Sequence, residues 1–233
     1  MIDLLISRAA QANMTLSRAQ AEKLQAYHRM LTEANARFNL TRVDDDPAEA
    51  IDRNYLDSLA PLPHLSGAKT CVDVGSGAGF PGVPLAIFLP DTHFVLMDSL
   101  AKRVEFLRGV IEELSLNAEA VCLRAEEAGR GAMRETFDAA TARAVAPLNV
   151  LCELLLPLVR VGGKAVALKG PGAAAEAEAA QNALEALGGR LFAIEEVPIP
   201  GRDWAHTLAV LAKTAPTPEK YPRRVGVPEK RPL

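Results

Sequence analysis

The chain has 233 residues, 49% of them hydrophobic and 24% charged, so it can bury the core of one α/β domain with an appendage. It has no uncharged apolar run of about 18 residues and no signal-peptide pattern, so we expect a cytoplasmic protein and not a membrane or secreted one. The three cysteines and four histidines are scattered along the chain, which argues against a disulfide framework and a metal site.

The first 60 or so residues have the spacing of amphipathic helices. Apolar side chains recur at helical intervals from Leu16 to Ala34, and Ser17 can cap the start of the main helix. The acidic stretch at residues 44–47 breaks this pattern, and the segment after it predicts a further helix. We therefore predict that residues 1–66 form an N-terminal helical cap.

From residue 70 the pattern changes to short apolar strands that alternate with helices, which predicts a parallel sheet with right-handed crossovers. The expected strands cover residues 70–74, 92–97, 119–123, 137–142, 163–168, 190–197 and 206–213. The expected helices between them cover residues 81–88, 101–115, 147–159 and 173–187. The segment that joins the last two strands is too short for a helical crossover, so these strands should pair antiparallel as a hairpin.

A glycine-rich turn follows the first strand, where residues 71–82 read CVDVGSGAGFPG. Gly75, Gly77 and Gly79 permit positive φ angles and let the backbone approach a ligand, which the N–H groups of the following helix then face. A dinucleotide fingerprint, GxGxxG, would need glycine at the position of Phe80. The GxGxG spacing instead resembles the first motif of S-adenosylmethionine (AdoMet) methyltransferases.

An acid closes the second expected strand, where residues 92–98 read THFVLMD. Asp98 falls where the second strand of a Rossmann-like fold delivers a carboxylate to the ribose hydroxyls of a cofactor. The glycine turn alone is also compatible with a tight strand-to-helix connection that binds nothing. The combination with Asp98 favours cofactor binding.

Ligands of an open parallel sheet bind beyond the carboxyl ends of its strands, near the point where the strand order reverses. This rule selects candidate residues before any family is considered. They are residues 75–80, residues 98–100, residues 124–126, Arg143, and residues 169–170.

Motifs along nearly the whole chain resemble the bacterial small-subunit rRNA methyltransferase G family (RsmG, also called GidB). The resemblance rests on VDVGSGAGFPG, MDSLAKRVEFL, RAEE, ARAVA, LKG, KYPRRVGVPEKRPL, FNLTR at residues 38–42 and YLDSL at residues 55–59. It implies a class I AdoMet-dependent methyltransferase (Rossmann-like) fold, with a seven-stranded, mostly parallel sheet that contains one antiparallel strand. Residues 67–214 would form this AdoMet-binding domain behind the N-terminal helical cap.

The resemblance also implies a reaction, the methylation of N7 of a guanine (nucleotide position 527) in 16S rRNA. Guanine N7 has an in-plane lone pair and no proton, so the methyl transfer needs no general base and positioning dominates. Arg143 and Lys169 are the predicted catalytic residues, in the sense that they position the substrate. The implied cofactor-binding residues are Gly75, Gly77, Gly79, Phe80, Asp98, Ser99, Leu100, Ala125, Glu126 and Arg143. The position before YLDSL is usually His in such sequences but is Asn54 here, which leaves the role of an imidazole at that position open.

The formal net charge of −3 conceals a basic end of the chain, because from Lys213 onward six basic residues face two acidic ones. A basic tail at residues 215–233 can bind phosphate, but it can equally be a solubilising end. The candidate RNA-binding residues are Lys169, Arg223, Arg224, Lys230 and Arg231. Trp204 lies in the expected hairpin turn, where it can stack on a flipped base or belong to the core.

Other interpretations remain open at this point. Asp73 can orient the loop amides or be a buried acid that caps local backbone. A nicotinamide-dependent oxidoreductase would share the fold, although Phe80 and the lack of a hydride-transfer constellation count against it. A non-catalytic RNA-binding or ribosome-assembly protein that retains AdoMet as a structural ligand is a third hypothesis. We expect 16S rRNA or the small ribosomal subunit as the partner, no membrane or metal, and a monomer.

Overall fold

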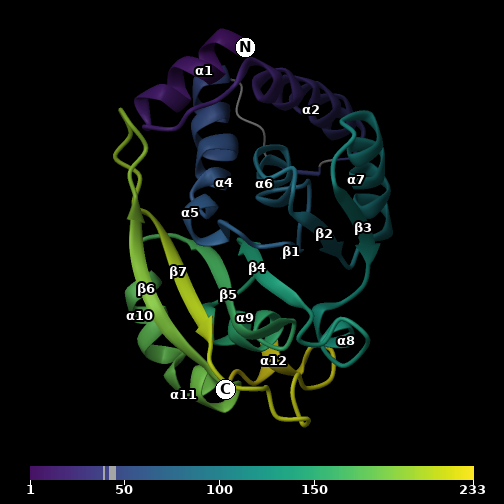
Figure 1. The fold of residues 1–233 in the computed structure, drawn as a ribbon, viewed down its shortest axis with the longest axis vertical. Coiled ribbons are helices and arrows are strands. Elements are labelled where there is room, and N and C mark those ends of the chain that lie inside the picture. The colour runs from purple at the N-terminus through teal and green to yellow at the C-terminus, as the bar shows by residue number, and fades with distance from the viewer. Residues whose placement is uncertain (39, 42–45) are drawn as a thin grey trace.

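A seven-stranded β-sheet forms the centre of the computed structural model, which describes residues 1–38, 40–41 and 46–233 (Figure 1). The strands are β1 (Thr70–Val74), β2 (His93–Asp98), β3 (Ala118–Cys122), β4 (Phe137–Arg143), β5 (Val159–Lys169), β6 (Gly189–Val197) and β7 (His206–Lys213). The helices before β2 are α1 (Ile2–Gln11), α2 (Arg18–Phe38), α3 (Pro47–Ala50), the π-helical turn η1 (Ile51–Leu56), α4 (Asp57–Leu59), α5 (Leu62–Leu65) and α6 (Gly82–Phe88). The later helices are α7 (Ala101–Glu113), α8 (Ala125–Ala128), α9 (Leu148–Leu155), α10 (Ala173–Ala179), α11 (Gln181–Ala186) and α12 (Val227–Lys230).

The strand order in the sheet is β3-β2-β1-β4-β5-β7-β6. Neighbours from β3 to β5 pair in parallel, whereas β7 is antiparallel to both β5 and β6. The predicted sheet with one antiparallel strand and a final hairpin is therefore confirmed. The strand order reverses between β1 and β4, so a ligand is expected beyond the carboxyl ends of these strands.

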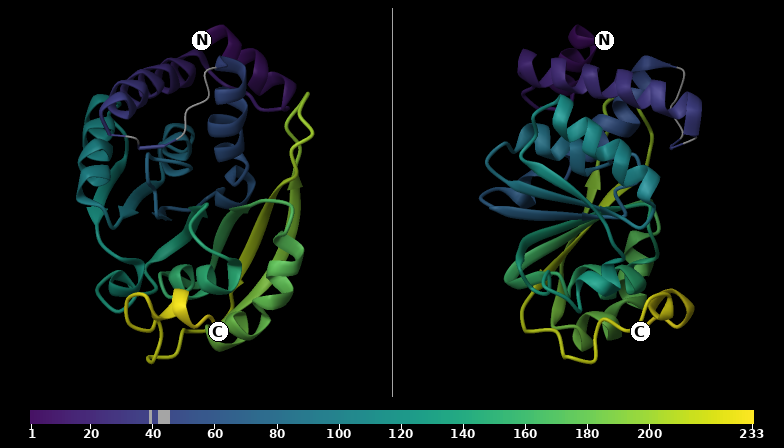
Figure 2. Two further views of the ribbon diagram at one scale, coloured as in Figure 1. Left: turned by 180° about the vertical axis from the view of Figure 1, so that it is seen from behind. Right: turned by 90° about the vertical axis from the view of Figure 1, so that its right-hand side faces the viewer.

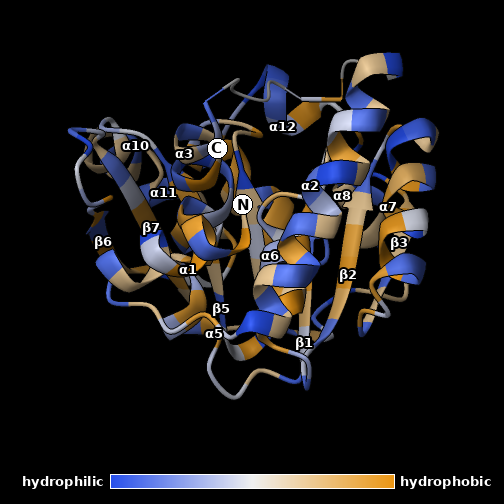
Figure 3. Cartoon of the chain, turned by 90° about the horizontal axis from the view of Figure 1, so that it is seen from above, coloured by the Kyte–Doolittle hydropathy of each residue, from blue (hydrophilic) through white to orange (hydrophobic). Residues whose placement is uncertain are grey.

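Side chains that alternate along the strands divide most of the core into two apolar clusters, one on each face of the sheet. On β2, Phe94 and Leu96 belong to the cluster that contains residues of α2, α6 and α7. Val95 and Met97 belong to the cluster that contains residues of α8, α9 and α11. Figure 2 shows the sheet edge-on between these two groups of helices, and in Figure 3 the buried strand β2 is largely apolar.

The largest differences from the predicted boundaries lie at two of the expected helices. The helix expected at residues 147–159 ends at Leu155, and β5 already begins at Val159. The pairing of β4 with β5 is irregular here, because the register shifts between Phe137 and Ala139. In addition, the residues on both sides of the boundary between α9 and β5 are apolar, so their periodicity does not separate helix from strand. The helix expected at residues 173–187 is split into α10 and α11, and its alanine-rich sequence contains no Gly or Pro to mark the break.

The N-terminal cap shares its core with the sheet. Ser17 caps α2 as predicted, because Gln20 N–H donates to Ser17 Oγ and the side-chain oxygen of Gln20 accepts from Ser17 N–H. Within the cap, Tyr27 and Tyr55 pack around Phe80 from the glycine turn, with ring centroids 5.4 and 5.7 Å from that of Phe80. The predicted break at residues 44–47 lies largely outside the described residues. No helix in the described part of the chain is long and apolar enough to cross a membrane.

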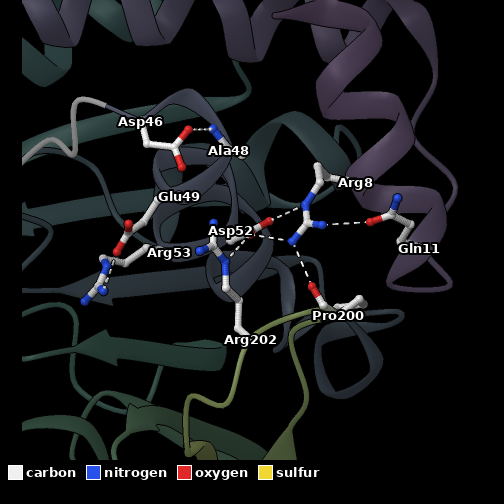
Figure 4. Close-up of polar contacts among 9 residues, drawn as sticks. All are labelled: Arg8, Gln11, Asp46, Ala48, Glu49, Asp52, Arg53, Pro200 and Arg202. Atoms are coloured by element: carbon white, nitrogen blue, oxygen red, sulfur yellow. Dashed lines mark hydrogen bonds and ion pairs between the residues drawn. The ribbon is translucent and has the colours of Figure 1, made fainter.

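A buried carboxylate joins the cap to the β6–β7 hairpin (Figure 4). Asp52 in η1 is fully buried and accepts hydrogen bonds from Arg8 of α1 and from Arg202 of the hairpin connection, each with an Nε–O distance of 2.8 Å. Arg8 also donates to the carbonyl of Pro200 in the same connection. Two guanidinium groups therefore neutralise one buried acid and fix the hairpin tip against the cap.

Candidate functional site

A cleft of about 270 Å³, called cleft A here, opens at the carboxyl ends of β1, β2 and β3. Five of its lining residues belong to the predicted cofactor set: Gly75, Asp98, Ser99, Ala125 and Glu126. The others are Arg124, which the position at the carboxyl end of β3 had selected as a ligand candidate, and Val74, Met97, Arg103, Leu123, Ala144, Val145 and Leu154, which the sequence did not single out.

The glycine turn shapes one wall of cleft A with its backbone. Gly75 has a φ angle of +72°, and a Cβ atom there would lie 2.7 Å from Val145 Cγ2, so only glycine fits this position. The N–H groups of Gly75 and Ser76 both donate to the carbonyl of Met97, at 2.8 and 3.0 Å. These bonds fix the turn against the end of β2.

Asp98 lines cleft A beside the glycine turn. Its side chain is almost fully buried; Oδ2 accepts from Gly77 N–H at 2.9 Å, and Oδ1 accepts from Leu100 N–H at 2.9 Å. Arg103 Nη1 lies 3.4 Å from Oδ2. Since a carboxylate has about four lone-pair positions, Asp98 retains acceptor capacity toward the cleft that it lines.

These groups fit AdoMet. The turn brings backbone into the cleft at Gly75, where a side chain would collide with Val145, and Asp98 offers the two-oxygen acceptor that a ribose diol needs. The carboxylate of Glu126, also in the cleft wall, can accept from an adenine amine; its Oε1 accepts from Gly226 N–H at 3.0 Å.

Several predicted cofactor residues support cleft A from behind instead of lining it. Phe80 is 5% exposed and packs among the aromatic rings of the cap. Gly79 is required by that packing, since a Cβ atom there would lie 2.7 Å from the hydroxyl of Tyr27. Gly77 donates its N–H to Asp98, and the side chain of Leu100 points into solvent with 51% exposure. Of the residues of the turn that the resemblance implies, Gly75 lines cleft A, whereas Gly77, Gly79 and Phe80 pack behind it.

Asp73 caps local backbone, the second of its two interpretations. It is fully buried, with Oδ2 accepting from Gly82 N–H at the start of α6 and Oδ1 accepting from the Thr141 hydroxyl. Burial raises the pKa of Asp73 to about 6, while the hydrogen bonds from Thr141 and Gly82 and the charge of Arg143 act in the opposite direction.

A second cleft, of about 260 Å³ and called cleft B here, adjoins cleft A. It is lined by Asp57, Arg143, Ala144, Leu168, Lys169, Gly170, Glu176 and His206. Ala144 lines both clefts and has a φ angle of +54°, a strained conformation for a residue with a Cβ atom. This residue at the end of β4 is therefore the point where the two clefts meet.

Arg143 lies in cleft B and not in cleft A. Its Nη1 donates to Asp57 Oδ2 at 3.2 Å, to the carbonyl of Arg53 and to the hydroxyl of Ser58. Its guanidinium carbon lies 4.7 Å from the ring centroid of Phe80. These contacts fix the orientation of the guanidinium plane. Within the described residues, every hydrogen bond that Arg143 donates through its side chain leaves from Nη1.

Lys169 faces the same cleft from the end of β5. Its Nζ lies 2.7 Å from Glu176 Oε2 and donates to the carbonyl of Ala146 at 3.0 Å. Across the cleft, Asp57 Oδ1 lies 2.9 Å from His206 Nδ1, so Asp57 bridges His206 and Arg143.

The sequence analysis did not indicate Asp57, Glu176 or His206 as site residues. Asp57 stands in the YLDSL motif, which was a signal for it, whereas Glu176 and His206 carry no motif and reach the cleft only through the packing of α10 and β7. Asn54 is buried in η1 and lines neither cleft. Trp204 is half-buried, lies against the guanidinium groups of Arg53 and Arg202, and stacks on His206.

The basic C-terminal segment is docked along its length. Arg223 forms an ion pair with buried Glu153, and its backbone N–H donates to the same carboxylate. Arg134 donates to the carbonyls of Thr217 and Tyr221. Among the candidate RNA-binding residues, Arg223 therefore anchors the segment, whereas the side chains at 224, 230 and 231 are exposed.

Solved structures with this fold define the class of the protein. An O-methyltransferase from Bacillus cereus in complex with SAH superposes with a TM-score of 0.60 at 17% identity, covering 91% of this chain and all of that one. Cofactor-bound Rv0187 from MTB superposes with a TM-score of 0.58 at 21% identity, covering 83% of this chain and 91% of that one. The chain therefore has the class I methyltransferase fold, as predicted.

Sequence comparison assigns the family. The family model GidB, rRNA small subunit methyltransferase G, matches residues 20–202. Ribosomal RNA small subunit methyltransferase G of Alkaliphilus metalliredigens is 44% identical over 218 residues, which cover 92% of this chain and 91% of that protein. The protein of the same description from Lactobacillus johnsonii is 41% identical over 237 residues, covering 99% of both chains. The chain belongs to the rRNA small subunit methyltransferase G family, which confirms the resemblance.

Proposed function

We propose that this protein transfers the methyl group of AdoMet to N7 of a guanine in 16S rRNA, at the nucleotide position, 527, that the family resemblance implies. The observation that carries the proposal is the meeting of clefts A and B at Ala144. Cleft A fits the cofactor, and cleft B presents the two predicted substrate-positioning residues, Arg143 and Lys169, next to it.

The residues of cleft A act by binding and orientation. The backbone of the glycine turn and the carboxylate of Asp98 hold the cofactor, and the carboxylate of Glu126 accepts from its adenine. Bound there, AdoMet supplies an electrophilic methyl group on a sulfonium centre. Ala144 lines both clefts, so an acceptor base held in cleft B would lie next to the cofactor in cleft A.

The residues of cleft B hold the acceptor base. Arg143 is already oriented through Nη1, which leaves its other N–H groups to donate to guanine O6 or to a phosphate. Lys169 has two acceptors in place and one further N–H to direct into the cleft. Alignment of N7 with the methyl group converts a bimolecular displacement into a unimolecular step, an effect worth about 7–11 kcal/mol in well-aligned cases.

The exposed cations Arg224, Lys230 and Arg231 supply the long-range attraction for the rRNA phosphates. The C-terminal segment that carries these cations is joined to the wall of cleft A by the hydrogen bond from Gly226 N–H to Glu126. This arrangement would place RNA backbone beside the cofactor and a single base in cleft B.

The test is methylation of 16S rRNA and of small ribosomal subunits from cells that lack this protein. With labelled AdoMet, we expect one methyl group per rRNA, mapped by mass spectrometry to N7 of one guanine. AdoMet, and not NAD, should raise the melting temperature of the protein. Binding of AdoMet without any transfer of label to either substrate would instead support the hypothesis of a non-catalytic assembly protein.

A further inference from the structure

The cationic side chains of cleft B each form an ion pair with a carboxylate in the same cleft. Lys169 is paired with Glu176 at 2.7 Å, and Arg143 is paired with Asp57 at 3.2 Å. A site that had only to attract phosphate would gain from unpaired cations, and the exposed cations of the C-terminal segment already serve that purpose. The two carboxylates in cleft B therefore require a separate explanation.

The proposed reaction provides one. When N7 takes the methyl group, its lone pair forms the new N–C bond, the electron pair of the broken S–C bond stays on sulfur, and no proton is transferred. The guanine ring thereby gains one positive charge. Two unpaired cations beside it would oppose this change, whereas a carboxylate beside it stabilises the charged ring.

Glu176 and Asp57 differ in what they can offer a base. Both oxygens of Asp57 are engaged, with His206 and with Arg143, and its side chain is 10% exposed. Glu176 accepts from Lys169 and from Leu148 N–H through Oε2 only; within the described residues no hydrogen bond uses Oε1. The side chain of Glu176 is 33% exposed and lines the cleft.

We propose that Glu176 is a catalytic and specificity-determining residue, whose Oε1 accepts from the N1–H and N2–H groups of the target guanine. This inference rests on the proposed function. Adenine presents an acceptor at N1 and no amine at C2, so the contact selects guanine. The positive charge gained at N7 makes N1–H a stronger donor, so the bond to Glu176 strengthens as the methyl group is transferred.

The experiment compares three variants with the wild-type protein: Glu176→Gln, Glu176→Asp, and Glu178→Gln as a control. Glu178 is an exposed acid on the same helix and lies outside cleft B. Two quantities are measured: kcat and KM with 16S rRNA, and the affinity for synthetic RNA hairpins that carry guanine or N7-methylguanine at the target position.

We expect Glu176→Gln to lower kcat about a hundredfold with KM changed less than threefold, because the bond strengthens only during the transfer. Wild-type protein should bind the N7-methylguanine hairpin about tenfold more tightly than the guanine hairpin, and Glu176→Gln should remove this preference. Glu176→Asp keeps the charge on a shorter side chain, so it should retain part of the wild-type kcat and part of the preference for the methylated hairpin. Glu178→Gln should match the wild type.

The affinity ratio does not depend on turnover, so it separates this inference from the proposed function. If the wild-type protein methylates no guanine N7, the proposed function fails. If the wild type methylates N7 but Glu176→Gln keeps its kcat, or keeps the preference for the methylated hairpin, Glu176 has no role toward the base. Circular dichroism would show whether Glu176→Gln is folded. If it is not, Glu176→Asp takes its place in the test. Because the aspartate side chain is shorter, a kcat and an affinity ratio equal to those of the wild type in Glu176→Asp would equally overturn the inference.

Discussion

Clefts A and B meet at one residue but are built in different ways. Cleft A lies where consecutive parallel strands end, and its glycine turn and Asp98 are brought together by hydrogen bonds of the loops themselves. Cleft B presents ionisable side chains on α4, β4, β5, α10 and β7, and its Asp57 pairs with Arg143 and His206, which lie far from it in the sequence.

The difference agrees with what each cleft is proposed to bind. A cofactor of constant shape can be held by a loop whose geometry a short motif specifies. A base presented by folded RNA must be selected by its hydrogen-bonding edges, which requires oriented side chains from several elements. Disruption of one cleft should therefore leave the other measurably intact.

The largest effect is expected in cleft B. Arg143→Ala should lower kcat/KM for rRNA methylation about a thousandfold, since about 4 kcal/mol is lost when two hydrogen bonds from a charged donor are removed. AdoMet affinity, measured by calorimetry, should change less than threefold because Arg143 does not line cleft A. Arg143→Lys should not restore the rate, because an ammonium group lacks the planar fork.

The control for Arg143 is Arg108→Ala, which removes the same charge from an exposed position on α7. Normal turnover by Arg143→Ala, with rRNA affinity unchanged, would remove this residue from the mechanism.

Beneath the two clefts, Asp73 should make stability depend on pH. Its pKa is raised to about 6 in the folded protein, so between about pH 4 and pH 6 the folded state holds a proton that the unfolded state has released. The contribution of Asp73 to the free energy of unfolding is thus highest at low pH and falls by up to about 3 kcal/mol as the pH rises through about 6. Urea unfolding of the wild type and Asp73→Asn at several pH values measures this difference.

Asp91→Asn, a change at an exposed acid, is the matched control for Asp73→Asn. Parallel stability curves for wild type and Asp73→Asn between pH 4 and pH 7 would mean that Asp73 titrates normally.

In cleft A, Asp98→Ala should weaken AdoMet binding about a hundredfold, because the hydroxyl groups of the ribose lose a charged acceptor. The affinity for rRNA should remain within threefold of the wild type, since Asp98 is not among the proposed RNA-binding residues and does not line cleft B. Calorimetry with AdoMet and a filter-binding assay with rRNA measure the two affinities. Glu105→Ala, an exposed acid on α7, should change neither, and unaltered AdoMet binding by Asp98→Ala would exclude cleft A as the cofactor site.

The smallest effect is expected outside both clefts. Combined replacement of Arg224, Lys230 and Arg231 by Ala should reduce the slope of log affinity against log salt by about 2, the value for three contacts to single-stranded phosphates. A triple variant that replaces Arg29, Arg37 and Arg108 provides the same charge change elsewhere. If both variants keep the wild-type slope, the C-terminal segment is a solubilising end.

The strands and their pairing were predictable because each strand is a short apolar run bounded by turn residues, and the β6–β7 connection is too short for a crossover. The glycine turn and Asp98 were predictable for a related reason: a loop that follows a strand is placed by local geometry. The predictions failed at two helix ends for different reasons. Helix α9 ends at Leu155 just before Pro157, a stop signal that the prediction passed over, whereas no Gly or Pro marks the break at Ala180.

The composition of the clefts was less predictable. Phe80 is adjacent in sequence to the cofactor turn, yet its ring packs against Tyr27 and Tyr55, because the cap provides an aromatic surface on that side. Arg223 belongs to a basic run, yet it is held by Glu153, a buried acid 70 positions earlier in the chain. Neither partner can be inferred from the residues that flank Phe80 or Arg223.

The amino-acid sequence by itself determined the sheet, the glycine turn with Asp98 and the family, since these depend on local periodicity, loop geometry and contiguous motifs. Only the tertiary structure decided which side chains form cleft B. Asp57 is brought to Arg143 and His206 by ion pairs and hydrogen bonds between elements far apart in the chain, and such pairings arise only once the sheet has placed those elements side by side.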